Sequence, residues 1–143
     1  MKDTSWENVS DWYHNLLTGD DTYQAKVILP HLERLIFSKD VPQNIIDIAC
    51  GQGFFSYAFQ SKGSKVLGVD ASKDLIKKAN EVEFKGEKPE FLVRQADDLF
   101  EVSDNQFDVV TIISAIQNIK NVGGVFAEAK RVMKKDGKVF IVM

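Results

Sequence analysis

The sequence is poor in the residues that build disulfides, metal sites and membrane spans. Its 143 residues contain one cysteine, Cys50, and only two histidines, His14 and His31. A single cysteine cannot form an internal disulfide, which favours a cytoplasmic protein. No apolar run approaches the ~20 residues of a membrane-spanning helix, and the first residues lack the apolar stretch of a signal peptide. We therefore expect a cytoplasmic chain with no membrane partner.

The charge balance excludes a second class of proteins. Eighteen Lys and Arg face 21 Asp and Glu, a formal net charge of −3, so no basic surface for nucleic acid is expected. The hydrophobic content of 44% suits one globular domain with a core. No Ser-His-Asp arrangement and no metal-ligand cluster is visible in the sequence. We therefore predict no metal site and assign no catalytic residue.

The stretch from Asn44 to Ser56 organises the chain. It begins with a short apolar run, typical of a strand that is buried on both faces. Gly51-Gln52-Gly53 interrupts the run, and the apolar residues of 54–61 then favour a helix. Glycines let the backbone pass close to a ligand and reach conformations that other residues resist. A strand, a glycine turn and a helix are the first half of a βαβ unit, and the turn predicts a ligand site.

Two residues bear on which ligand this turn would bind. A dinucleotide fingerprint reads Gly-x-Gly-x-x-Gly or Ala, and here Ser56 occupies the third position. Asp47 lies inside the strand, where its negative charge is unfavourable beside a pyrophosphate and suits a ligand with a cationic end. Both residues argue against an NAD(P)-linked oxidoreductase, which we keep as an alternative.

The spacing between the glycine turn and a second acid also bears on the ligand. Residues 65–70 read as a strand that ends in Asp70, 19 positions after Gly51. This matches the ~20-residue spacing to the acid that binds ribose hydroxyls in nucleoside-binding folds. Asp70 could also cap the helix that begins near Ser72. The two roles are compatible.

The rest of the chain continues the alternation of strands and helices. We predict a helix that begins at Ala71 or Ser72 and runs through Val82. After it we predict strands at 90–94, 107–116 and 139–143, a helix over 125–133 and a turn at 135–138. Upstream, apolar spacings predict helices over 5–17 and 22–37, the second kinked or divided at Pro30. The alternation predicts an α/β fold with a doubly wound parallel sheet, strand order 3-2-1-4-5 and helices on both faces.

Several motifs carry a family resemblance. Asp47-Ile-Ala-Cys-Gly-Gln-Gly53 resembles the first motif of class I S-adenosylmethionine-dependent methyltransferases, Asp-x-Gly-x-Gly-x-Gly, with Ala49 in place of the first glycine. Val69-Asp-Ala-Ser72 and Phe107-Asp-Val-Val110 resemble the second motif and the central strand. The resemblance covers about residues 44–143. It implies transfer of a methyl group from S-adenosylmethionine to a small-molecule acceptor, with S-adenosylhomocysteine as product.

The resemblance also implies a division of the chain and a set of contacts. Residues 44–143 would be the cofactor-binding domain, and the helical segment 1–43 would pack on the sheet and could cover the cofactor. Asp70 would bind the ribose, Asp47 the methionyl end, and either Gln95 or Asp97 the adenine. The full set of predicted cofactor contacts is Tyr23, Asp47, Ala49, Cys50, Gly51, Gly53, Asp70, Ala71, Ser72, Ala96, Asp97, Asp98, Ile113 and Ser114.

The last residues raise a further expectation. The resembling enzymes continue after the fifth strand with a helix and an antiparallel pair of strands. We therefore expect that this chain is truncated, which leaves open whether it is catalytically active. A non-catalytic fragment that binds the cofactor or a partner protein is therefore an alternative. Residues 139–143 are all apolar and would form an exposed edge strand, which could pair with a second copy as a homodimer.

Overall fold

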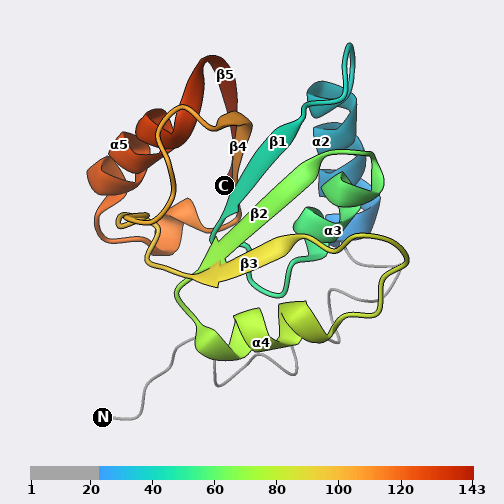
Figure 1. Ribbon diagram of the computed structural model, residues 1–143, viewed down its shortest axis with the longest axis horizontal. Helices are drawn as coiled ribbons and strands as arrows, with labels where there is room; N and C mark the ends of the chain where they lie inside the picture. The colour runs from blue at the N-terminus through green and yellow to red at the C-terminus, as the bar shows by residue number, and fades with distance from the viewer. Residues whose placement is uncertain (1–22) are drawn as a thin grey trace.

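A parallel sheet of five strands forms the centre of the computed structural model, which describes residues 23–143 (Figure 1). The strands lie in the order β3-β2-β1-β4-β5, and every neighbouring pair is parallel. They are β1 (Asn44–Ile48), β2 (Lys65–Asp70), β3 (Glu90–Val93), β4 (Phe107–Ile113) and β5 (Met133–Val142). The predicted fold class and strand order are confirmed.

Helices cover both faces of the sheet. They are η1 (Gln24–Ile28), α2 (Leu29–Ile36), α3 (Phe54–Ser61), α4 (Lys73–Glu81), η2 (Ile116–Asn118) and α5 (Val122–Val132). Figure 1 shows α2 and α3 on one side of the sheet and α5 on the other. The sequence predicts that the second helical segment is kinked or divided at Pro30. In the structure a π-helical turn, η1, passes without a break into α2, and Pro30 lies in the first turn of α2. The helix predicted over 5–17 lies outside the described residues.

The alternation of side chains along the strands builds two cores. Ile46 and Ile48 of β1 pack with α5, in a cluster that includes Val125 and Ala129. Ile45 points to the opposite face and packs in the cluster that contains residues of α2 and α3. Successive side chains of a strand point to opposite faces, so Asp47 shares the α3 face with Ile45. This geometry places a buried acid beneath the helix that follows the glycine turn.

The last strand differs from the prediction. The sequence 135–138 predicts a turn before a short strand, but β5 begins at Met133, directly after α5. The turn residues are absorbed as a bulge: Phe107 pairs with Met133 and Val109 with Lys138, so β5 advances five residues where β4 advances two. A bulge bends one strand while the ladder continues. The pairing with β4 therefore overrides the local turn chemistry.

Candidate functional site

A cavity of about 460 Å³ lies at the carboxyl ends of the strands. This is the edge where open α/β sheets bind ligands, at the point where the strand order reverses between β1 and β4. The loops after β1, β2, β3 and β4 all contribute to its wall. Its lining comprises Ala49, Gly51, Asp70, Ala71, Leu75, Arg94, Gln95, Ala96, Asp97, Ile113, Ser114, Ala115, Asn118, Ile119, Lys120 and Asn121.

The turn after β1 forms the floor of this cavity through its backbone. Ala49, Gly51 and Gly53 all have positive φ values, of 60°, 58° and 84°. A left-handed conformation is cheap for glycine and strained for other residues, which explains the glycines and makes Ala49 a strained exception. A Cβ on Gly53 would lie 2.7 Å from Cζ of Phe91. The turn therefore depends on both the flexibility and the small size of its glycines.

Asp70 lies on the wall of the cavity and is fixed by the backbone. Its Oδ2 accepts a hydrogen bond from the Gly51 N–H at 2.9 Å, and its Oδ1 accepts one from the Ser72 N–H, also at 2.9 Å. Burial raises the pKa of Asp70, and these two N–H groups oppose that rise. Ser72 itself caps α4, because its Oγ accepts from the Leu75 N–H at 3.2 Å. The carboxylate thus joins the glycine turn to the start of α4 and keeps further lone pairs for a ligand.

The loop after β3 supplies a second acid to the cavity. Gln95, Ala96 and Asp97 line it, so both candidates for the adenine contact are present. Asp97 is half-buried, and its Oδ2 accepts a hydrogen bond from Nδ2 of Asn121 at 3.0 Å. Asp98 is exposed and lies outside the lining. The structure therefore groups Asp70 and Asp97 around one cavity.

The wall after β4 contains the predicted contacts Ile113 and Ser114, followed by polar residues that the sequence analysis did not assign. Ser114 follows β4 with a positive φ of 54°, and its N–H donates to the Val142 carbonyl at 2.7 Å. Asn118, Lys120 and Asn121 follow and line the cavity with polar groups. A single asparagine or lysine in a loop carries no spacing signal. Their position directly after the strand at the switch point was the clue that could have identified them.

Asp47 lies behind the cavity wall instead of on it. Only 2% of this residue is exposed, and its oxygens accept hydrogen bonds from Ser56 Oγ at 2.7 Å and Thr111 Oγ1 at 2.9 Å. Burial, only partly offset by these two hydroxyls, raises its pKa to about 6. These bonds tie β1 to α3 and to β4. Within the described residues, Asp47 joins these three elements and does not line the cavity.

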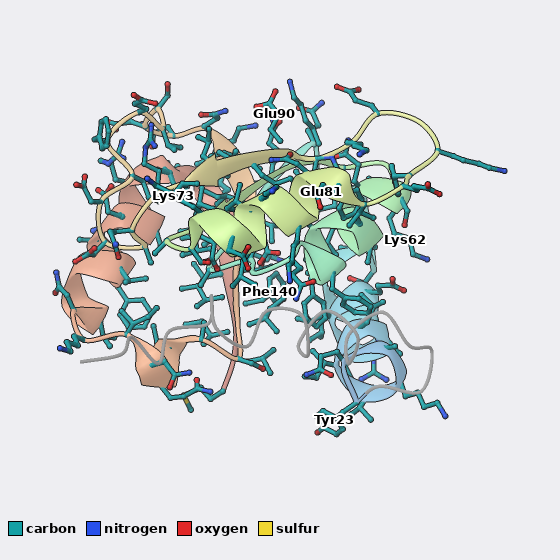
Figure 2. All side chains as sticks on the ribbon, turned by 90° about the horizontal axis from the view of Figure 1, so that it is seen from below. Tyr23, Lys62, Lys73, Glu81, Glu90 and Phe140 are labelled. Carbon is teal, nitrogen blue, oxygen red and sulfur yellow. The ribbon has the colours of Figure 1, made fainter. Side chains whose placement is uncertain are left out.

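Four other predicted contacts also lie outside the cavity lining. Tyr23 is 65% exposed and lies directly before η1 (Figure 2). Burial raises the pKa of the Cys50 thiol, and the nearby Asp47 raises it further. Gly53 faces Phe91, and Ser72 is occupied as a helix cap. These positions place Tyr23 away from the cavity, while Cys50, Gly53 and Ser72 shape the loops that form it.

Residues 23–143 contain neither a cluster of metal-ligand side chains nor a helix suited to a membrane. In this part of the chain no three His, Cys, Asp or Glu side chains are grouped so that they could hold a metal ion. Nor does any of its helices have the length and apolar character to cross a membrane.

Comparisons with known proteins agree with this geometry. The model of a family described as a methyltransferase domain matches residues 46–141. A ubiquinone biosynthesis O-methyltransferase from Methylococcus capsulatus is 30% identical over 96 residues, which are 66% of this chain and 40% of that protein. The chain spans about two fifths of the length of the curated relatives it matches.

Two solved structures have the same fold. A protein from Pyrococcus horikoshii OT3 is 31% identical, with a TM-score of 0.77 over 92% of this chain and 64% of that one. A protein from Methanococcus maripaludis, 18% identical, has a TM-score of 0.81 over 99% of this chain and 65% of its own and shows the fold alone. The chain belongs to the methyltransferase domain family, and its fold is that of the class I S-adenosylmethionine-dependent methyltransferases.

Proposed function

We propose that this chain is the cofactor-binding part of an S-adenosylmethionine-dependent methyltransferase that acts on a small molecule. The observation that carries the proposal is the convergence of the glycine turn, Asp70 and Asp97 on one cavity at the carboxyl edge of the sheet. Family membership supports the same reaction class. The division into a helical segment, 1–43, and a cofactor domain, 44–143, stays a prediction.

The residues of the cavity suit the nucleoside part of this cofactor. Its volume of about 460 Å³ falls within the roughly 300–1,000 Å³ of small-molecule sites. Asp70 presents carboxylate lone pairs, which suit the two adjacent hydroxyls of a ribose. The left-handed turn at Gly51 brings backbone, and no side chain, to the floor beside Asp70. Asp97, or Gln95 in the alternative, would accept from the adenine amino group.

The protein's part in the reaction is mainly alignment. When bound, S-adenosylmethionine supplies a methyl group on a sulfonium sulfur, which makes that carbon electrophilic. Holding two reactants in position can lower a barrier by about 7–11 kcal/mol. Asn118 and Lys120, on the wall after β4, are placed to orient an acceptor at the mouth of the cavity. Ile113 and Ile119 give the same wall an apolar part that excludes water.

The names of the relatives indicate the broad chemical class of the methyl acceptor. Several curated relatives are named ubiquinone biosynthesis O-methyltransferases, which supports a small-molecule acceptor and an oxygen as the acceptor atom. No nucleic-acid partner is expected from the net charge of −3. A cytoplasmic location, expected from the sequence, stays a prediction.

Isothermal titration calorimetry tests the proposal. The wild type should bind S-adenosylhomocysteine and not NAD. Asp70→Ala should weaken that binding at least tenfold, because each hydrogen bond to a charged group contributes about 1.5–3 kcal/mol. Asp98→Ala is the matched control, since it removes the same charge from an exposed acid outside the cavity. Thermal unfolding of each variant verifies that it folds.

Each contrary result has a meaning. Binding of NAD in place of S-adenosylhomocysteine would favour the oxidoreductase alternative. A folded wild type that binds neither would favour a fragment that binds a partner protein. An unchanged dissociation constant in folded Asp70→Ala would refute the role of Asp70.

A homodimer through the fifth strand is a separate proposal. β5 lies at one edge of the described sheet, where Val139 and Ile141 are 37% and 40% exposed. Pairing of two such edges would cover these side chains and satisfy the free backbone groups of the strand.

A further inference from the structure

We infer that Asn121 is a positioning residue that holds Asp97 ready for the amino group of a 6-aminopurine. The inference rests on the proposed function and adds the way in which the site would select adenine. Asn121 Nδ2 donates to Asp97 Oδ2 at 3.0 Å and so joins the loops after β3 and β4. Both residues line the cavity.

The orientation of the Asn121 amide is determined by α5. Its Oδ1 accepts a hydrogen bond from the Gly124 N–H at 3.0 Å and so caps the first turn of this helix. Backbone N–H groups in the first turn need such an acceptor. Since the oxygen faces the helix, the amide must present its NH₂ group to Asp97. The cap therefore fixes both the position and the hydrogen-bonding sense of the side chain.

Gly124 gives Asn121 the space that this arrangement needs. A Cβ on Gly124 would lie 2.3 Å from Nδ2 and 2.8 Å from Cγ of Asn121. At Gly123, one residue earlier in the same helical turn, an added Cβ would meet nothing within 4 Å. Only one of the two adjacent glycines therefore constrains the asparagine, and the pair provides a matched set of variants.

The same helix also holds the rest of the loop that follows Asp97. Glu128 Oε2 accepts from the Leu99 N–H at 2.7 Å, and Arg131 donates to the Leu99 and Val102 carbonyls at 2.8 and 2.7 Å. Helix α5 thus fixes this loop at several points along its length. Among these contacts, the hydrogen bond of Asn121 is the one that reaches Asp97, a side chain that lines the cavity.

The arrangement has a chemical consequence for the ligand. Asn121 occupies Oδ2 of Asp97, and within residues 23–143 the carboxylate has no other hydrogen-bond partner. Oδ1 of Asp97 can then accept a hydrogen bond from the amino group of a ligand in the cavity. If the ligand carried a carbonyl oxygen at the same position, that oxygen and the carboxylate would both be acceptors, with no hydrogen to share between them. A site of this kind selects an amino-substituted purine over its 6-oxo counterpart.

The test compares S-adenosylhomocysteine with S-inosylhomocysteine, in which the 6-amino group is replaced by oxygen. Calorimetry on the full chain should show that the wild type prefers the adenosine compound by about tenfold or more, the loss expected when a charged acceptor is left unpaired. Asn121→Ser keeps an oxygen for the helix cap but is too short to reach Asp97. This variant should reduce the preference at least threefold. A general structural loss would weaken both compounds equally and leave the ratio unchanged.

The glycine pair gives an independent route to the same answer. Gly124→Ala should reduce the preference as Asn121→Ser does, because its methyl group displaces the asparagine. Gly123→Ala should leave the preference at the wild-type value. Equal ratios in all four proteins would overturn the inference while binding of S-adenosylhomocysteine still upheld the proposed function. A wild type that bound neither compound would overturn both.

Discussion

The buried acid Asp47 allows a quantitative prediction about stability. Its pKa of about 6 in the folded protein compares with an ordinary value of 3.8. An acid whose pKa is raised by folding binds its proton more tightly in the folded state. Protonation therefore stabilises the fold, and this stabilisation is lost as the pH rises through about 6. At about 1.36 kcal/mol per pKa unit, the full effect is about 3 kcal/mol.

Asp47→Asn isolates this effect. The amide has the same shape, can bond both Ser56 and Thr111 (the hydroxyl partners of Asp47), and carries no charge at any pH. Relative to the wild type, the variant should gain stability as the pH rises. Between pH 5 and pH 8 the difference in unfolding free energy should change in its favour by about 1.4 kcal/mol.

Urea unfolding of both proteins at pH 5, 6, 7 and 8 measures this difference. Subtracting the two curves removes the contribution of titrating groups that do not interact with Asp47. Asp70 is not among them, because its charge contributes to the raised pKa of Asp47. Asp47→Leu is an informative companion, because it also removes the charge but leaves the two hydroxyls without an acceptor, and it should be less stable than Asp47→Asn at every pH. A difference between the wild type and Asp47→Asn that stays constant from pH 5 to 8, or falls as the pH rises, would refute a raised pKa for Asp47.

Two further predictions concern the glycine turn and the sheet edge. Gly53→Ala and Gly86→Ala both place a side chain at a positive φ, but only at Gly53 does the new Cβ meet Phe91. In denaturant unfolding, Gly53→Ala should therefore lose about 1–3 kcal/mol more unfolding free energy than Gly86→Ala. Equal losses in the two variants would contradict the steric argument. Light scattering over a concentration series should show association of the wild type that Ile141→Lys abolishes, since a charge on an edge strand opposes pairing; a constant monomer mass for the wild type would exclude pairing through β5.

The elements nearest the glycine turn could be predicted from the sequence almost residue by residue. The prediction places α3 at 54–61 and β2 at 65–70, as observed, because Gly53 precedes the helix, Gly63 separates the two elements and each contains an apolar run. The start of β5 could not be predicted, since Lys135-Asp136-Gly137 carries the local signal of a turn. Its pairing with β4 is a long-range contact that no local pattern reveals.

Some residues of the candidate site could be predicted from the sequence, and others could not. Asp70 could be identified because a fixed spacing from Gly51 reflects the length of one strand-helix-strand unit. For Asp47, the sequence shows an acid in a strand but not which face of the sheet it occupies. Its burial follows from Ile45 on the same face and from Ser56 above it. Asn121 could not be found, because its role depends on a contact with Asp97, 24 residues earlier.

The contacts of α5 with the loop after β3 have a consequence for how the protein folds and opens. This loop precedes β4 in the chain, but the helix that holds it is synthesised after β4. The side of the cavity formed by the loop after β3 can therefore become ordered only when the chain through Arg131 is in place. Local opening of α5 would release this loop and would also uncover the side chains of β1 and β4 that pack against the helix. Amide hydrogen exchange in the loop and in α5 should therefore slow together when ligand binds.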